Sequence, residues 1–377
     1  MNTAITFEEA RRIVELIAEV GRRNFDSHDV SACNVLKPIL DKRKRGKGIT
    51  EDEANLLANF LYLNAVLDQG RDPKGVKQML IGVTNRAYQR GIRYLHDPDE
   101  FFKHVGDLVE LIAEEHERVK MIRRPETGIQ AYSLWGTRVN PYTMHRWGTV
   151  LLCLKRMADN GLTLLTYINQ AGKAENVPRL IRDDETYGLG DAIGWKAARL
   201  WVKWITHTFG IVRGDPLLWG PNSYEIPLDS NVGGVTMRTG LLFLITNERD
   251  LRETQCWIKQ ADGRINLSAQ RLNQEIAIPD NFPLDRELRE VLRAWGQRRR
   301  NFIRFLNAFV LHLQRQAAEV SIGQLDDGFL HVGQNFCHND SAPDCPRCPL
   351  RTVCKANTQE PELKTKYYCG TGQGVFF

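Results

Sequence analysis

The sequence has no long uninterrupted apolar run. Near the first residue, the apolar positions are broken up by charged side chains at Glu8, Glu9, Arg11 and Arg12. The longest apolar stretch, Leu56 to Leu67, is too short and too polar to span a bilayer. We therefore expect no signal peptide and no membrane partner, and a soluble, cytoplasmic protein.

The sequence also has little of the strict alternation of apolar and polar residues that marks a half-buried strand, and no internal repeat or low-complexity tract. Apolar residues instead recur at helical spacing. Two S/T-x-x-E capping boxes, Thr6 with Glu9 and Thr50 with Glu53, predict that a helix begins at each. The expected fold class is all-α.

Further helices are expected from Asp99 and along the apolar-periodic run from Asp285 to about Val320. Turns are expected at 159–161, 213–222 and 279–283, where Gly, Asn, Asp and Pro gather. The basic cluster from Lys42 to Lys47 is interpreted as an exposed linker. These segments leave room for two compact lobes within 377 residues.

The overall composition is that of an ordinary globular protein, with 42% hydrophobic and 26% charged residues. The net charge of +5 permits an anionic partner without requiring one. Four arginines that fall in or near one helical run add local positive charge, although such a run is commonly a solvated face: Arg298, Arg299, Arg300 and Arg304. Charge alone does not indicate nucleic acid.

Half of the eight cysteines crowd into one short segment. Cys337, Cys345, Cys348 and Cys354 follow the spacing C-x7-C-x2-C-x5-C, which lets four thiolates of one loop converge on a single inorganic centre. Spacing alone leaves zinc and a [4Fe-4S] cluster both open, together with inert thiols. The other four are isolated and are expected to be ordinary buried or surface thiols: Cys33, Cys153, Cys256 and Cys369.

Two further segments could carry chemistry. The stretch from Leu189 to Ala198 predicts a short turn, with Gly190 and Gly194, that opens into a helix whose start could face a phosphate. Farther on, Asp229 stands at an expected helix start, where an aspartate is usually only a cap. Taken singly, each segment is equally consistent with a purely structural role.

The order of these segments resembles that of the endonuclease III-like DNA glycosylases, which belong to the helix-hairpin-helix (HhH-GPD) family and carry an iron-sulfur loop. Residues 193–198 read I-G-W-K-A-A, similar to the family's V-G-x-K-T-A. Residues 229–232 read D-S-N-V, similar to D-T-H-V and to the D-T-N-V of plant 5-methylcytosine glycosylases. Residues 345–351, C-P-R-C-P-L-R, resemble the cysteine loop, and residues 69–72, Q-G-R-D, resemble the Q-A-T-D segment from which the family inserts a glutamine into DNA.

The sequence departs from the family in several places. Asp191-Ala192 replaces Pro-Gly in the hairpin, and Gly234 stands where an arginine is common. The first gap of the cysteine loop is one residue longer, and an insertion from about Ile211 to Glu225 separates Lys196 from Asp229. These departures bear on substrate choice and on the contact with the DNA backbone.

The resemblance implies a fold of two lobes: a six-helix barrel with the hairpin over residues 50–225, and a discontinuous iron-sulfur lobe over residues 1–49 and 226–377. It implies a monomer that acts on double-stranded DNA, in the nucleoid if the source is prokaryotic. Cys337, Cys345, Cys348 and Cys354 would hold a [4Fe-4S] cluster. Gln69 would fill the gap left by the flipped base, and Gly190 and Gly194 would contact the DNA backbone.

The resemblance also implies a division of labour in catalysis. Asp229 would stabilise the positive charge that grows on the sugar as the glycosidic bond breaks, and a helix start favours its ionised form. Lys196, at the start of the second hairpin helix, would attack the sugar C1′, because the same dipole disfavours its ammonium form. The expected activity is that of a bifunctional DNA glycosylase and AP lyase, and Asn231 favours a modified or oxidised pyrimidine as the base removed.

Two alternatives stay open at this point. A monofunctional mismatch or adenine glycosylase would lack the catalytic amine, so Lys196 argues against it. In that case Lys196 would be a solvated or phosphate-contacting lysine. A non-catalytic hairpin module that binds nucleic acid, with zinc on the four cysteines, is the alternative from another class of protein.

Overall fold

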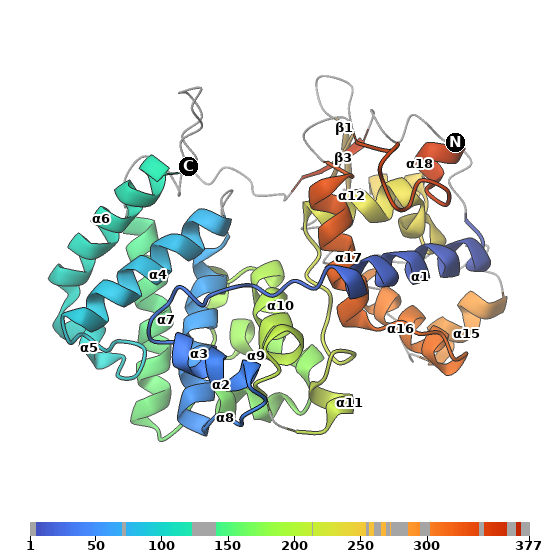
Figure 1. Ribbon diagram of the computed structural model, residues 1–377. Helices are drawn as coiled ribbons and strands as arrows, with labels where there is room; N and C mark the ends of the chain where they lie inside the picture. Colours follow the sequence, from blue (N-terminus) through green and yellow to red (C-terminus); the bar gives the residue numbers. More distant parts are fainter. Residues whose placement is uncertain are drawn as a thin grey trace. The chain divides into compact units, whose positions relative to one another are not determined.

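The computed structural model describes residues 5–69, 73–122, 141–212, 214–253, 256–259, 265–268, 272, 286–294, 302–338, 343–359 and 367–370. These residues are mostly helical, as the sequence predicts (Figure 1). They form two compact units. We call residues 27–220 the central unit, and residues 1–26 with 221–377 the terminal unit.

The central unit is built around one helix that is buried on nearly every face, α3 (Glu51–Leu67). This helix contains the longest apolar stretch of the chain, and a helix that is apolar all round must lie inside the protein. Its neighbours are α4, α7, α8 and α10 (Figure 1). The other elements of the unit are α2 (Lys37–Lys44), α4 (Pro73–Gln89), α5 (Asp99–Lys103), α6 (Val105–Ile122), α7 (Pro141–Asp159), α8 (Leu164–Ile168), η1 (Asn169–Ala171), η2 (Ala174–Asn176), α9 (Val177–Asp183), η3 (Gly190–Ala192), α10 (Trp195–Lys203), the π-helical turn η4 (Trp204–Thr208) and α11 (Pro216–Trp219).

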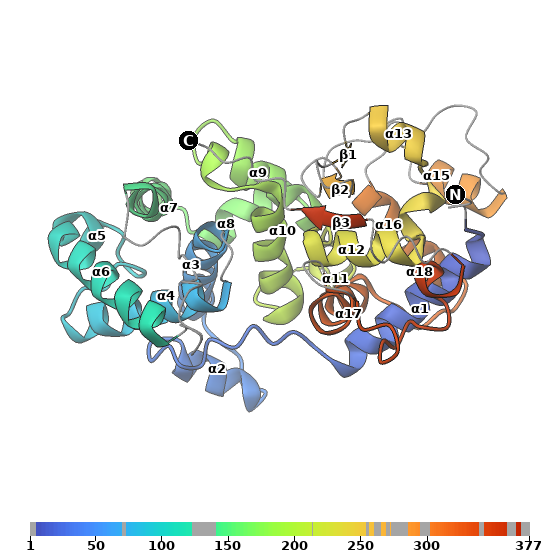
Figure 2. The same ribbon diagram turned by 90° about the horizontal axis from the view of Figure 1, so that it is seen from above.

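The terminal unit is organised by two helices that cross in close contact, α1 (Phe7–Arg23) and α17 (Ile322–Asn335) (Figures 1 and 2). A Cβ on Gly21 would lie 1.8 Å from the Gln324 carbonyl oxygen, and one on Gly328 would lie 1.9 Å from that of Ile17. Glycine at both positions therefore lets the two backbones touch. The other elements are α12 (Ser230–Thr239), η5 (Leu241–Leu244), α13 (Glu248–Glu253), β1 (Trp257–Lys259), β2 (Ile265–Ser268), α15 (Arg286–Ala294), α16 (Phe302–Arg315), α18 (Lys355–Thr358) and β3 (Tyr367–Gly370).

A small three-stranded sheet, which the sequence did not predict, also belongs to the terminal unit. β1 pairs antiparallel with β2, and β2 pairs parallel with β3, with Ile265 opposite Tyr367. β3 lies against α12 (Figure 2). The parallel pair joins segments that are far apart in the sequence, so a local alternation of apolar and polar residues could not predict it.

The boundaries of the central unit differ from those expected from the sequence. The expected range was 50–225, and the observed range is 27–220. Residues 27–49 belong to the central unit. His28 stacks on Trp204 with 3.8 Å between the ring centroids, and its Nε2 lies 3.0 Å from the Asn64 Oδ1. Asn34 N donates to the Asn85 Oδ1 over 2.8 Å. These polar and aromatic contacts carry no periodic signal in the sequence.

At the other boundary, residues 221–225 belong to the terminal unit. The Tyr224 hydroxyl donates to the Asp326 carboxylate over 3.0 Å, and its carbonyl oxygen accepts from the Asn307 side chain over 2.7 Å. Arg304 pairs with the buried Glu225 over 2.7 Å. Arg304 is thus held by an internal partner, while Arg298, Arg299 and Arg300 lie outside the described residues.

The two predicted capping boxes are confirmed. Thr6 and Thr50 each accept a hydrogen bond from the N–H of the glutamate three residues on, and the glutamate carboxylate accepts from the threonine N–H in return. The helix expected at Asp99 is α5. The turn at 159–161 is also confirmed, with Gly161 at φ +70°.

Other local predictions need correction. The basic cluster from Lys42 to Lys47 is an exposed connection only in its second half, because α2 continues to Lys44 and Lys42 pairs with Glu53. The run from Asp285 holds two described helices, α15 and α16, and the second ends at Arg315. Part of the turn expected at 213–222 is the short helix α11, and the turn at 279–283 lies outside the described residues. No described helix is long and apolar enough to cross a membrane.

Candidate functional site

The predicted turn that opens into a helix is confirmed in the central unit. α9 ends at Asp183, and the chain returns through η3 to α10, which packs against α9. Gly190 adopts φ +54°, a left-handed conformation that glycine takes at no steric cost. The buried Ile193 anchors the turn, and Gly194 is the N-cap of α10. Gly190 and Gly194 are therefore brought to one hairpin.

Gln69 also lies at this hairpin, although it is far away in sequence. Its Nε2 donates to the carbonyl oxygens of Val66 over 2.7 Å and of Ala192 over 2.8 Å. Its Oε1 accepts from the Gly194 N–H over 2.8 Å. The side chain is thus bonded to the hairpin, and the remaining residues of the Q-G-R-D segment, Gly70 to Asp72, lie outside the described residues.

Lys196 stands in the first turn of α10 and is half-buried. Its neighbour Trp195 lies beneath two guanidinium groups, that of Arg182 at 4.8 Å and that of Arg199 at 5.5 Å from the ring centroid. Arg182 also reaches Asp191, whose fully exposed carboxylate lies 3.4 Å from the Arg182 Nη2. Next to Lys196 the hairpin thus combines an aromatic ring, the partly buried Arg182, the buried Arg199 and one exposed carboxylate.

The helix start predicted at Asp229 is confirmed in the terminal unit. The Asp229 Oδ1 accepts from the N–H groups of Asn231 over 2.8 Å and Val232 over 3.1 Å, which caps α12. The Asn231 side-chain amide lies 3.4 Å from the Oδ2. Asn231 is itself packed against α17, since a Cβ on Gly333 would lie 2.5 Å from the Asn231 Cβ. The carboxylate is therefore held in one orientation.

The other end of α12 is joined to the cysteine loop by Arg238, whose side chain is buried. The Arg238 Nη1 donates to the carbonyl oxygens of Cys337 over 3.0 Å and His338 over 2.8 Å, and it lies 3.3 Å from the Cys337 sulfur. The Cys354 thiol donates in turn to the Arg238 carbonyl oxygen over 3.4 Å. Sequence reasoning missed this role, and the only local signal was the position of Arg238 in the last turn of the helix that Asp229 begins.

Of the four predicted cysteines, Cys354 is buried, and Cys337, Cys345 and Cys348 are partly buried. Burial raises the pKa of the Cys337 thiol, and the Arg238 guanidinium opposes that rise. Burial also raises the pKa of Cys348 to about 11 and that of Cys354 to about 12. In all three cases nearby thiols of the loop, including Cys345, raise the pKa further.

Backbone bonds shape the loop around these thiols. Cys337 N donates to the Val332 carbonyl oxygen over 2.8 Å, and Cys354 N donates to that of the buried Leu350 over 2.8 Å. The N–H of Cys348 donates to the Cys345 carbonyl oxygen over 3.2 Å. Within the described residues, no three His, Cys, Asp or Glu side chains meet as a group that could hold a metal ion.

The donor set still fits an iron-sulfur cluster, or zinc, by its chemistry. Four thiols are the ligands that both centres prefer. A bound cation deprotonates its thiol ligands, which removes the cost of burying them as separate thiolates. The isolated Cys33, Cys153 and Cys256 are buried, as expected of ordinary thiols, and Cys369 lies in β3.

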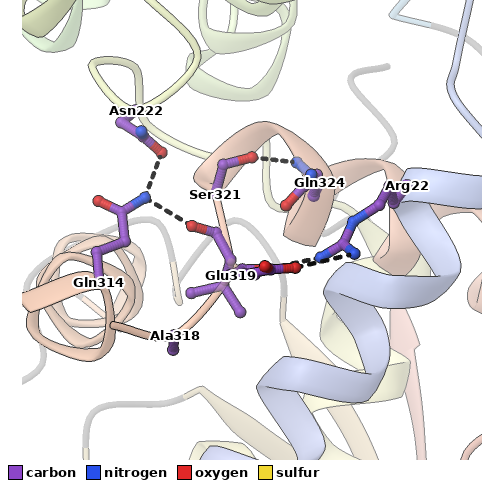
Figure 3. Close-up of a pocket in the computed structure, with 8 residues that line it drawn as sticks. Arg22, Asn222, Gln314, Ala318, Glu319, Ser321 and Gln324 are labelled. Atoms are coloured by element: carbon purple, nitrogen blue, oxygen red, sulfur yellow. Dashed lines mark hydrogen bonds and ion pairs between the residues drawn. The ribbon is translucent and has the colours of Figure 1, made fainter. Parts of the chain in front are cut away.

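An open hollow of about 550 Å³ in the terminal unit lies at the start of α17. Its polar groups satisfy one another (Figure 3). The Gln314 Nε2 donates to the Asn222 Oδ1 over 3.1 Å and to the Val320 carbonyl oxygen over 2.6 Å. The Arg22 Nη2 donates to the Glu319 carbonyl oxygen over 2.7 Å. None of the sequence-predicted site residues lines this hollow. We therefore do not place the chemistry there.

No protein-family model, curated protein or solved structure matches this chain. The functional argument therefore rests on the residues and their contacts. The hairpin with Lys196 belongs to the central unit, and Asp229 with the cysteine loop belongs to the terminal unit.

Proposed function

We propose that this protein is a DNA glycosylase with AP lyase activity, which removes a damaged or modified base from double-stranded DNA. The observation that carries the proposal is that α12 links two features predicted from the sequence, the aspartate at a helix start and the four-cysteine loop. Asp229 caps the start of this helix, and Arg238 in its last turn bonds to Cys337 of the cysteine loop. A glycosylase needs a carboxylate at a fixed position, and α12 is held at both ends.

The reaction begins with the base flipped out of the duplex, because its glycosidic bond is inaccessible inside the stack. As the bond breaks, positive charge develops on the sugar. Asp229 would stabilise that charge better than water could, since its carboxylate is already oriented by two backbone N–H groups. The half-buried position of Asp229 is compatible with access to a sugar.

Lys196 would supply the nucleophile. Its Nζ forms a bond to C1′ as the bond from C1′ to the base breaks, and the departing base takes up a proton. Loss of the amine protons and opening of the sugar ring then give a Schiff base. Removal of a proton from C2′ expels the 3′-phosphate and cuts the strand. The half-buried lysine at the start of α10 supports this role, since it keeps the amine near the hairpin surface.

Cys337, Cys345, Cys348 and Cys354 would hold a [4Fe-4S] cluster. When bound, the cluster would fix the loop and supply no step of the glycosidic chemistry. The loop carries two exposed cations, Arg347 and Arg351, that could contact DNA phosphates. Arg347 pairs with Asp344 over 2.9 Å, and Arg351 donates to the Pro346 carbonyl oxygen over 3.1 Å. We further propose that the protein acts on duplex DNA as a monomer.

The decisive experiment screens protein purified without oxygen against duplexes that each carry one modified base, with oxidised and methylated pyrimidines included because of Asn231. Release of a free base, together with stoichiometric iron and sulfide, would support the proposal. Stoichiometric zinc without iron, and duplex binding without release of any base, would instead support the non-catalytic binding module.

A further inference from the structure

We infer that Gln69 is a positioning residue that clamps the hairpin turn, and that it is not the side chain inserted into the duplex. The clamp is a property of the central unit by itself. Its meaning for DNA rests on the function proposed above. The inference replaces the role that the Q-G-R-D resemblance assigned to this glutamine.

The three hydrogen bonds of Gln69 use both ends of its amide. Nε2 donates to Val66 O and Ala192 O, and Oε1 accepts from the Gly194 N–H, at 2.7, 2.8 and 2.8 Å. Ala192 and Gly194 lie on either side of the residue at which the hairpin turns into α10. One side chain thus fixes a carbonyl group and an N–H group on both sides of that turn. A glutamine inserted into DNA would have to give up all three bonds.

The absence of a side chain at Gly194 leaves room for the Gln69 amide. Its φ of −77° is open to any residue, so the backbone itself does not require glycine there. A Cβ at this position would instead lie 3.1 Å from the Gln69 Oε1, closer than ordinary contact. The glycine is therefore explained by the glutamine above it, and the two residues act as a matched pair.

The clamp connects the hairpin to the best-buried helix of the central unit. Val66 lies in the last turn of α3, and a second tie joins the same two helices, because the Trp201 Nε1 donates to the Ala58 carbonyl oxygen over 3.2 Å. Lys196 follows Gly194 by two residues. The orientation of the Lys196 backbone thus depends on a contact with a residue 125 positions before Gly194.

Two variants separate the clamp from an inserted side chain. Gln69→Met keeps the length but removes every hydrogen bond. Gln69→Glu keeps an acceptor for the Gly194 N–H but sets a carboxylate oxygen against two carbonyl oxygens. If Gln69 is a clamp, Gln69→Met should speed hydrogen exchange at the Gly194 amide, without DNA, by roughly tenfold, the effect of losing one typical hydrogen bond. Gln69→Glu keeps that acceptor and should speed the exchange by less. Gln89→Ala, an exposed glutamine of the same unit, is the control and should change nothing.

A second measurement uses duplex that contains an abasic site. At saturating duplex, both variants should slow borohydride trapping by about tenfold, while the Kd for that duplex changes by less than about threefold. Gly194→Ala should slow trapping as well, and adding Gln69→Ala to it should restore part of the rate, because the second change removes the side chain that the new methyl group meets. Such non-additivity is the mark of two residues in contact.

The outcomes are distinguishable. Unchanged exchange at the Gly194 amide in Gln69→Met would overturn the clamp, whatever happens with DNA. Strongly weakened binding to abasic duplex with normal exchange would assign Gln69 the inserted role and would also overturn the inference. If no variant and no wild-type protein binds duplex, the proposed function fails. In that case faster exchange in the variants would still support the clamp as a structural device.

Discussion

Two helix starts carry the proposed chemistry, and they are built in different ways. α12 begins at Asp229, whose own carboxylate accepts the N–H groups of Asn231 and Val232. α10 begins at Gly194, which has no side chain to cap it, and Gln69 instead accepts from the N–H of Gly194 itself. The first start is capped within three residues, and the second is capped from a distant part of the chain.

The difference matters for function, because each kind of cap suits what its helix would do. Asp229 serves as cap and as the proposed charge stabiliser, so the same hydrogen bonds that begin α12 also orient the reacting carboxylate. At α10 the cap and the proposed nucleophile are separate residues, Gln69 and Lys196. A change in the cap of α10 can therefore alter the geometry of the nucleophile while leaving its chemistry intact.

The largest effect should come from removing the support behind α12. Gly328→Ala places a methyl carbon 1.9 Å from the Ile17 carbonyl oxygen. Because this neighbour is a backbone atom, one of the two helices would have to shift to relieve the clash. We expect the free energy of unfolding to fall by about 3 kcal/mol or more in denaturant titration. Gly148→Ala in α7 is the control, since its nearest neighbour is 3.9 Å away, and it should be neutral or stabilising. Equal stability of both variants would refute the close crossing.

The next effect concerns the carboxylate itself. Asp229→Asn keeps the cap acceptor but removes the charge, so base release should slow by roughly a hundredfold or more while duplex affinity at fixed salt is retained. Borohydride trapping during base removal should slow in parallel. Asp215→Asn is the matched control, because Asp215 also caps a helix, accepting from Leu217 N over 2.9 Å. Full base release by Asp229→Asn would remove Asp229 from the mechanism.

A smaller effect is expected at the other end of α12. Arg238→Met removes the buried guanidinium that bonds Cys337 and His338, and hydrogen bonds from charged groups contribute about 1.5–3 kcal/mol each. Iron should therefore pass to a chelator about tenfold faster or more, as followed by loss of the brown colour. Arg351→Met, an exposed arginine of the same loop, should release iron at the wild-type rate. Equal rates for the two variants would contradict the link between α12 and the loop.

The smallest effect is expected at the hairpin tip. Asp191→Asn removes an exposed negative charge next to the turn, so duplex affinity at low salt should rise by about two- to fivefold. The gain should fade as salt increases, because exposed charges are screened. Asp159→Asn, which removes an exposed carboxylate at the end of α7, provides the comparison. An Asp191→Asn protein that binds no better would indicate that the hairpin tip does not approach the DNA backbone.

Local features of the structure could be predicted from the sequence, because their cause lies within a few residues. The capping boxes at Thr6 and Thr50 and the helix start at Asp229 each need only a side chain and the next three N–H groups. The hairpin turn was predictable for the same reason, since Gly190 supplies the left-handed conformation.

Contacts between distant segments could not be predicted in this way. The bonds from Gln69 to the hairpin and from Arg238 to the cysteine loop join segments about a hundred residues apart or more. Residues 27–49 belong to the central unit through single contacts such as His28 on Trp204. Neither periodicity nor composition encodes such pairs, because each depends on where the rest of the chain brings its partner.

The central claim is that Lys196 is the nucleophile of a DNA glycosylase and lyase. Borohydride trapping on duplex that contains an abasic site tests it most directly, with Lys155→Ala as the control, a lysine of α7 that pairs with Asp99 over 2.9 Å. The account predicts a covalent protein-DNA adduct for the wild type and for Lys155→Ala, and none for Lys196→Ala. An adduct of undiminished yield in Lys196→Ala would contradict it.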